Sequence, residues 1–199
     1  MNSWKYETFS SLSLGLKEKL TIFPREKDMI FSGMRFVWNV LIRLWLKLYF
    51  RLKIVGRDHL PTQESYILIA NHASHLDAIC LSAMLPIRSI GTTFSLAARD
   101  YFFSSFFRSF LAAICINAIP FERRKSPRQS LELCADALAV SNQTLILFPE
   151  GTRSPTGEIQ SFKSGIGYLT AGSPCLVVPV YIDGAFAAWP KDCLTPKPK

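Results

Sequence analysis

The sequence predicts a single α/β domain with a mixed central sheet covered by helices and an amphipathic helix before it. The chain has 199 residues, 49% of them hydrophobic, which is enough to bury one substantial core. After Gly56 and Pro61, short apolar runs alternate with helical patterns, as is typical of a sheet covered by helices. We therefore divide the chain into an N-terminal arm and helix, residues 1–55, and a domain over residues 56–199.

The N-terminal part contains a basic amphipathic stretch between Met34 and Lys53. Apolar residues there fill the spaces between cations that recur at multiples of four, which predicts a helix with a basic stripe beside a broad apolar face. The cations are Arg35, Arg43, Lys47 and Arg51. Residues 1–30 show no clear period and no apolar core of the secretory type, so we expect a loose arm and find no support for export.

Five apolar runs predict the strands of the sheet. They are Tyr66–Ala70, Phe94–Ala97, Cys115–Ile119, Thr144–Phe148 and Leu176–Ile182. Pro179 cannot donate a hydrogen bond within a sheet, so we expect the last strand to lie at an edge or to bulge.

A helix is predicted from Ser126 to about Val140, because a capping serine is followed by a proline in the first turn and a glutamine at the third position. We expect its buried side to carry Leu131, Leu133, Ala135, Leu138 and Val140.

Charge and hydropathy together favour a membrane surface as a partner. The 23 Lys and Arg residues against 15 Asp and Glu give a formal charge of +8, which attracts nucleic acid, anionic lipid or phosphorylated substrates. The mean hydropathy of +0.18 and the 15 Phe residues exceed what a soluble nucleic-acid binder usually needs. We therefore expect no nucleic-acid partner.

The basic helix offers two interpretations. It can lie in the headgroup region with its cations toward anionic lipid, or it can pack on the domain with its cations solvated. No segment reaches the roughly 18 uninterrupted apolar residues that are typical of a membrane-spanning helix. The five cysteines form no C-x-x-C pair, so we expect them to be reduced and mostly buried.

Ionisable groups follow the first predicted strand, in residues 71–77 (Asn-His-Ala-Ser-His-Leu-Asp). Ligands bind at the carboxyl ends of strands in open α/β sheets. On a helix His72 and Asp77 would point about 140° apart, so contact requires His72 in a loop and a helix that begins near Ser74. Asp77 would then orient the imidazole while His72 takes a proton from a substrate hydroxyl.

Two alternatives remain for this segment. Ser74 and Asp77 also match a capping box, in which Asp77 only stabilises a helix N-terminus. A metal site formed by His72, His75 and Asp77 is disfavoured, because no further ligand cluster lies nearby in the sequence.

A second polar segment, residues 148–154 (Phe-Pro-Glu-Gly-Thr-Arg-Ser), follows another predicted strand. Arginine can bind a phosphate with two donors, and glycine lets backbone N–H groups approach it. The alternative is a tight turn with a solvated arginine. Arg123 with Arg124, and Lys163, are further basic positions near predicted strand ends. The sequence has neither a Walker lysine nor a G-x-S-x-G elbow, which disfavours a P-loop NTPase and an α/β-hydrolase.

Together these segments resemble the glycerolipid acyltransferase family, which includes the lysophosphatidate acyltransferases. Residues 71–77 resemble its His-x4-Asp motif, residues 119–123 (Ile-Pro-Phe-Glu-Arg) its arginine-bearing motif, residues 148–154 its third motif and residues 178–180 (Val-Pro-Val) its fourth. Relatives commonly continue past the position of Lys199 with more strand-forming sequence, so a smaller sheet or a missing pocket wall is expected here.

The resemblance implies that His72 is the general base and Asp77 its partner. It implies a substrate-binding set in which the arginines, the lysine and the Glu-Gly turn hold the acceptor's glycerol phosphate and the proline shapes a pocket. This set is Asn71, Ser74, Arg123, Glu150, Gly151, Thr152, Arg153, Lys163 and Pro179.

The resemblance also implies a reaction. An acyl-CoA or acyl carrier protein thioester would be attacked directly by the hydroxyl of 1-acylglycerol-3-phosphate, giving phosphatidic acid, with no metal and no cofactor. The protein would act at the cytoplasmic side of a membrane. The alternatives are another lysophospholipid acceptor and a non-catalytic membrane-binding module of the same fold.

Overall fold

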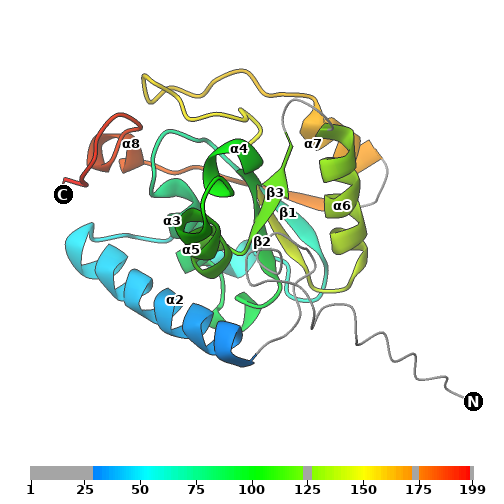
Figure 1. The fold of residues 1–199 in the computed structure, drawn as a ribbon, viewed down its shortest axis with the longest axis horizontal. Coiled ribbons are helices and arrows are strands. Elements are labelled where there is room, and N and C mark those ends of the chain that lie inside the picture. The colour runs from blue at the N-terminus through cyan, green and yellow to red at the C-terminus, as the bar shows by residue number, and fades with distance from the viewer. Residues whose placement is uncertain (1–28, 123–126, 172–174, 198–199) are drawn as a thin grey trace, which may run out of the picture.

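The computed structural model describes residues 29–122, 127–171 and 175–197. Five strands form one sheet in the order β3-β2-β4-β1-β5 (Figure 1). The strands are β1 (Tyr66–Ala70), β2 (Thr93–Ala98), β3 (Ala118–Phe121), β4 (Thr144–Leu147) and β5 (Leu176–Val180).

All four strand pairings are parallel, which corrects the expectation of a mixed sheet. The reason is that every connection between consecutive strands contains a helix, which brings the chain back to the end of the sheet where the previous strand began. The helices are α2 (Met29–Tyr49), α3 (Asp77–Met84), α4 (Arg99–Phe102), α5 (Phe106–Ile116), α6 (Pro127–Ala139), α7 (Gly165–Ala171) and α8 (Ala185–Ala188), with short 3-10 helices at Arg57–His59 and Ile87–Ser89.

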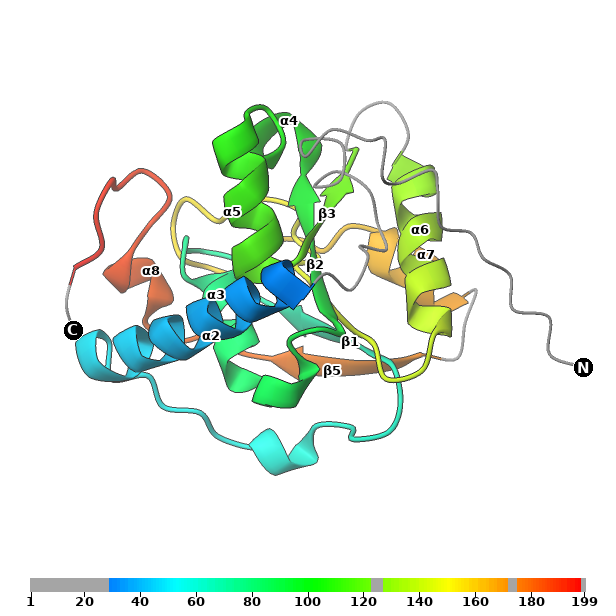
Figure 2. The same ribbon diagram turned by 60° about the horizontal axis from the view of Figure 1, so that its bottom comes forward.

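The helices cover both faces of the sheet (Figures 1 and 2). Ile67 and Leu145 pack in a core cluster with residues of α6 and α7, whereas their neighbours Leu68 and Ile146 pack in a second cluster with residues of α3. Because successive side chains of a strand point to opposite faces, the central strands are buried on both sides and read as continuous apolar runs.

Each predicted strand has a counterpart, and the bounds agree to within two residues except at the start of β3. β3 begins at Ala118 rather than at Cys115, because Cys115 lies in α5 and Asn117 ends that helix in a left-handed conformation with φ 46°. β5 lies at the edge of the sheet and Pro179 is exposed, as the proline predicted.

The helix predicted from Ser126 corresponds to α6, although Ser126 itself lies outside the described residues. Its buried side carries Leu131 and Leu138, but Leu133 is 47% and Val140 59% exposed, which corrects the expected face. The helical period turns Leu133 about 200° away from Leu131, and it places Cys134 in the core instead.

The five cysteines are all unpaired. Cys80 and Cys134 are buried as expected, whereas Cys115, Cys175 and Cys193 are only partly buried. Burial raises the pKa of the Cys80 thiol to about 12, so that this thiol stays protonated and behaves as a small apolar side chain.

The α2 helix packs on the domain through part of its basic stripe. Arg35 donates to the Ile90 carbonyl at 2.8 Å, and burial lowers its pKa to about 10. Arg43 donates to the carbonyls of Ser82 and Leu85 at 3.0 and 2.7 Å, at the C-terminus of α3. These two cations face the protein and not a headgroup layer, because they satisfy carbonyl groups that α3 and the loop after it leave unpaired.

The outer face of α2 is apolar. Lys47 is exposed, as are apolar side chains along the whole helix, among them Phe36, Val37, Val40, Leu41, Leu44 and Leu48. Among the described residues, α2 is the one helix that is long and apolar enough to cross a membrane, by length and composition alone. Of its most apolar stretch, 17% is buried. The count of uninterrupted apolar residues in the sequence did not predict that α2 could span a membrane.

Candidate active site

His72 lies in the loop between β1 and α3, as the motif spacing required. Its Nδ1 is 2.8 Å from Oδ2 of Asp77, the first residue of α3, and the Asp77 side chain is only 1% exposed. The imidazole stacks on the ring of Phe148 with a centroid distance of 4.0 Å. The Nε2 atom has no hydrogen-bond partner among the described residues and is therefore left for a substrate.

The capping interpretation of Asp77 also holds in part. The same Oδ2 atom accepts the backbone N–H groups of Ala73 and Ser74, both at 2.7 Å. Ser74 is buried, and its hydroxyl donates to the Trp189 carbonyl at 2.7 Å while accepting from the N–H of Leu76. Asp77 therefore shapes the loop and holds the imidazole at once, and Ser74 ties this loop to the segment after α8.

The side chains of two predicted site residues form hydrogen bonds with backbone groups and do not line the cavity described below. The carboxamide of Asn71 pairs with the backbone of Ile182 in both directions, at 3.0 and 2.8 Å, and so joins the end of β1 to the segment after β5. Glu150 is 2% exposed, and its Oε1 accepts the backbone N–H of His72 at 2.8 Å.

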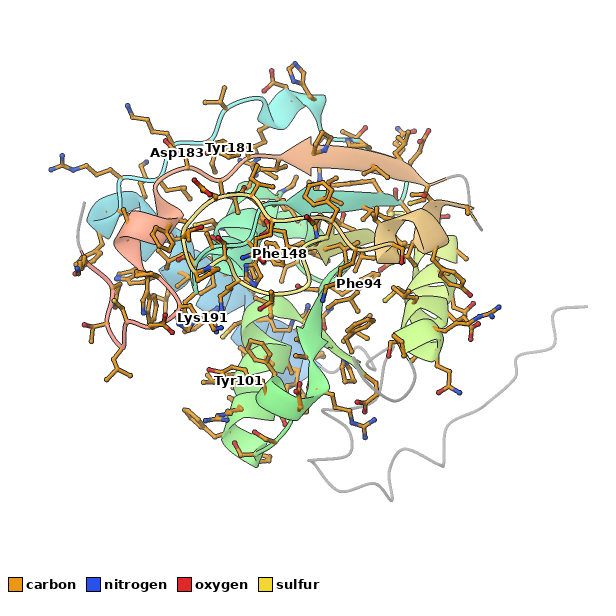
Figure 3. The ribbon with its side chains drawn as sticks, turned by 90° about the horizontal axis from the view of Figure 1, so that it is seen from above. Phe94, Tyr101, Phe148, Tyr181, Asp183 and Lys191 are labelled. Carbon is orange, nitrogen blue, oxygen red and sulfur yellow. The ribbon has the colours of Figure 1, made fainter. Side chains whose placement is uncertain are left out.

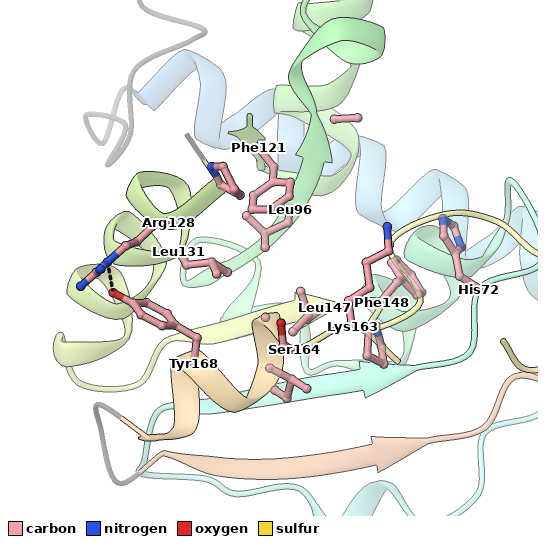
Figure 4. Close-up of a pocket in the computed structure, with 16 residues that line it drawn as sticks. His72, Leu96, Phe121, Arg128, Leu131, Leu147, Phe148, Lys163, Ser164 and Tyr168 are labelled. Carbon is pink, nitrogen blue, oxygen red and sulfur yellow. Dashed lines mark hydrogen bonds between the residues drawn. The ribbon is translucent and has the colours of Figure 1, made fainter. Parts of the chain in front are cut away.

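A cavity of about 530 Å³ begins at His72 and extends between the sheet and helices α6 and α7 (Figure 4). Its middle is lined by apolar side chains, namely Leu96, Phe121, Leu131, Leu147 and Ile166. Polar groups lie at its two ends. Lys163 and Gly151 join His72 at one end, while Arg128 and Tyr168, 3.3 Å apart, lie at the other.

Gly151 and Lys163 meet at the His72 end of the cavity. Gly151 has φ +69°, a conformation that favours glycine, and a side-chain Cβ there would lie 3.0 Å from Nζ of Lys163. The lysine side chain therefore lies directly on Gly151, which places its ammonium group at the cavity (Figure 4). The sequence predicted both residues as phosphate contacts but not their mutual contact.

Arg153 meets His75 and does not line the cavity. Its Nη1 is 2.6 Å from Nδ1 of His75, whose Nε2 is 3.1 Å from the carbonyl of Lys191 and whose ring packs near Trp189. Burial first, and then the charge of Arg153, lower the pKa of His75, which favours the neutral imidazole. Within the described part of the chain, no group of three His, Cys, Asp or Glu side chains is placed to hold a metal ion.

The remaining predicted residues lie elsewhere. Thr152 is exposed in the turn, Pro179 pairs with Ile69 at the sheet edge away from the cavity, and Arg123 lies outside the described residues. Sequence reasoning missed Phe148, which stacks on His72 and lies near the middle of the view from above, with Lys191 and Tyr101 further out (Figure 3). Its place at a strand end beside a polar segment was the available signal.

The chain is similar to known acyltransferases. The sequence model of the Acyltransferase family matches residues 51–183. A "1-acyl-sn-glycerol-3-phosphate acyltransferase" of Limnanthes douglasii is 29% identical over 147 residues, which are 74% of this chain and 50% of that protein. The alpha form of Homo sapiens is 26% identical over 133 residues, 65% of this chain and 44% of its own length. The chain thus spans about half the length of these curated relatives.

A solved structure has the same fold. The crystal structure of the 1-acyl-sn-glycerophosphate acyltransferase PlsC from Thermotoga maritima matches with a TM-score of 0.65 and 23% identity, over 84% of this chain and 64% of that one. The family match includes β1, β4 and both polar segments that follow them. By that match, the chain belongs to the Acyltransferase family.

Proposed function

We propose that the protein transfers a fatty acyl chain from acyl-CoA or acyl carrier protein to the hydroxyl of 1-acylglycerol-3-phosphate, giving phosphatidic acid for phospholipid synthesis. The observation that carries this proposal is the 2.8 Å His72–Asp77 pair at the mouth of an apolar cavity. Relatives named for this reaction support the choice of acceptor.

The geometry suggests the steps of the reaction. With a proton on Nδ1, His72 donates to Asp77, and the lone pair on Nε2 accepts the proton of the acceptor hydroxyl. The hydroxyl oxygen then bonds to the thioester carbonyl carbon, the carbon–sulfur bond breaks, and the imidazolium returns the proton to the leaving thiolate. A thioester is already activated, so a base and oriented substrates are enough, and no acyl-enzyme intermediate is needed.

The cavity has properties that suit a lipid substrate. Its volume of about 530 Å³ lies within the usual range for ligand sites, and its middle is apolar along the direction in which an acyl chain would extend from His72. Lys163 brings a cation to the end where the acceptor hydroxyl must lie, so it is placed to bind the acceptor's phosphate.

The same proposal includes a membrane surface as partner, with the protein on the cytoplasmic side. The exposed apolar face of α2 continues onto α5, where Phe107 is 67% and Phe106 47% exposed. Phe31 and Phe110, with ring centroids 6.5 Å apart, link the two helices. Apolar side chains of this kind are typical of helices that lie in the membrane interface.

An acyl-transfer assay tests the function directly. The protein is incubated with acyl-CoA or acyl carrier protein thioesters and with 1-acylglycerol-3-phosphate or lysolipids of larger headgroup. We expect the phosphate monoester to be the preferred acceptor, and His72→Ala to reduce turnover by roughly 10²–10⁴-fold. His59→Ala is the matched control, since His59 is exposed on the segment before β1.

Equal turnover by the wild type and His72→Ala would reject the mechanism. A preference for a larger headgroup would favour the alternative acceptor. Vesicle binding without transfer from any donor would favour a non-catalytic membrane-binding module.

A further inference from the structure

The backbone of His72 is held on both sides by the turn that follows β4. Its N–H donates to Oε1 of Glu150 at 2.8 Å, and its carbonyl accepts the N–H of Ser154 at 2.7 Å. Resting on the function proposed above, we propose that Glu150 and Ser154 are positioning residues that hold the base in place through its backbone.

Burial and charge support this assignment. Glu150 is 2% and Ser154 0% exposed, so neither reaches a substrate without a rearrangement of the turn. A carboxylate also repels a phosphate at the distances of a binding contact. Oε1 of Glu150 accepts from His72, and its buried Oε2 has no partner among the described residues, so the one bond of this side chain there is to the loop that carries the base.

The turn itself is well fixed. The N–H of Gly151 donates to the Phe148 carbonyl at 3.0 Å, and the hydroxyl of Ser154 accepts from the N–H groups of Thr156 and Gly157 at 3.3 and 3.1 Å. A rigid turn that holds both backbone polar groups of one residue also fixes the position of its Cα atom.

The sheet explains why the two segments meet. β1 and β4 are parallel neighbours, with Ile69 opposite Leu147, so their loops leave the sheet side by side. Asp77 and Phe148 fix the orientation of the imidazole, while Glu150 and Ser154 fix where its backbone lies. Proton transfer depends on both, because misplacement of a catalytic group by 1 Å can cost about 10²-fold in rate.

Kinetics of Glu150 variants separate positioning from substrate contact. Glu150→Gln keeps an oxygen that can accept from His72, so we expect kcat and KM to stay close to those of the wild type. Glu150→Ala and Glu150→Asp withdraw that oxygen, and we expect kcat to fall by roughly 10–100-fold with KM for 1-acylglycerol-3-phosphate unchanged. A rise in KM with kcat intact would overturn the assignment, as would equal loss of kcat in Glu150→Gln and Glu150→Ala.

A spectroscopic measurement does not depend on activity. The chain has three histidines, so ¹⁵N-histidine NMR of this chain in detergent gives few imidazole signals. We expect Glu150→Asp to shift the ring signals of His72 and to leave those of His59 in place, while Glu150→Gln shifts neither. Unchanged His72 signals in Glu150→Asp would refute the positioning role. If the wild type transfers no acyl group, the proposed function fails but this measurement still decides the contact.

Discussion

Asp77 accepts three hydrogen bonds on one oxygen atom. Oδ2 accepts from the imidazole of His72 and from two backbone N–H groups of the same loop. The loop that presents the base is therefore folded around the carboxylate that orients it. Loss of the carboxylate affects catalysis and loop structure together unless the substitution keeps an oxygen in place.

Asp77→Asn separates these two effects. Its amide oxygen, placed where Oδ2 lies, can still accept from Ala73, Ser74 and the imidazole, but the amide carries no negative charge to stabilise an imidazolium. We expect kcat to fall by roughly 10²–10⁴-fold, since the imidazolium that forms on proton transfer loses the negative charge that stabilises it.

Thermal unfolding supplies the control for this variant. Asp77→Asn should unfold near the wild-type temperature, whereas Asp77→Ala leaves two N–H groups unpaired, each of which costs about 1–3 kcal/mol when buried. If Asp77→Asn retained wild-type turnover, the carboxylate would be a loop-forming group only.

The sequence predicted the His72–Asp77 contact because the spacing of five residues allows only one geometry, with the histidine outside the helix. It did not predict that Glu150 binds the His72 backbone or that Arg153 meets His75. Both contacts join residues 78 positions apart, and they depend on the neighbouring positions of β1 and β4, which local patterns do not specify.

At the scale of elements, α2 uses its cations for two different purposes. Arg43 binds carbonyl groups at the C-terminal end of α3, whereas Lys47, one turn further along, is exposed. The periodicity that predicted one basic stripe does not distinguish these positions, because the partner of Arg43 is a set of backbone carbonyls about 40 positions away.

Arg43→Met and Lys47→Met form a matched pair on this helix. We expect Arg43→Met to lower the free energy of unfolding by about 1.5–3 kcal/mol, because two charge-assisted hydrogen bonds are lost. Lys47→Met should stay within about 0.5 kcal/mol of the wild type. Urea unfolding measures both, and equal stability of the two variants would show that the Arg43 contacts do not stabilise the fold.

Most elements were predictable, with limits that have physical causes. The strands buried on both faces stood out as apolar runs, and Pro179 correctly marked an edge strand. The predicted start of β3 and part of the predicted buried side of α6 were wrong, because Cys115 and Leu133 are apolar enough for either a core or a surface position. The strand directions followed only from the helical connections.

At the scale of the whole molecule, α2 and α5 pack together and both carry exposed apolar side chains. We expect replacement of Leu41, Leu44 and Leu48 by Gln to weaken binding to anionic vesicles, because burial of each large aliphatic side chain contributes roughly 1.5–3 kcal/mol. Vesicle co-sedimentation measures the change. Val140→Gln is the control, since Val140 is similarly exposed but follows α6 on the other side of the sheet.

Turnover in mixed micelles distinguishes loss of membrane binding from loss of the site. The triple variant should remain active when acceptor and donor are both presented in detergent, since none of its substitutions lies in the cavity. Wild-type vesicle binding by the triple variant would assign membrane association to another surface.

The central position of β1 has a consequence for biosynthesis. This strand leaves the ribosome early, but its partners β4 and β5 and the Ile182 backbone that binds Asn71 come more than 70 residues later. Pairing across such separations is slow compared with local helix formation. The nascent chain must therefore be synthesised beyond Ile182 before the histidine loop can close, and a polypeptide that stops short of this residue has no assembled His72 loop.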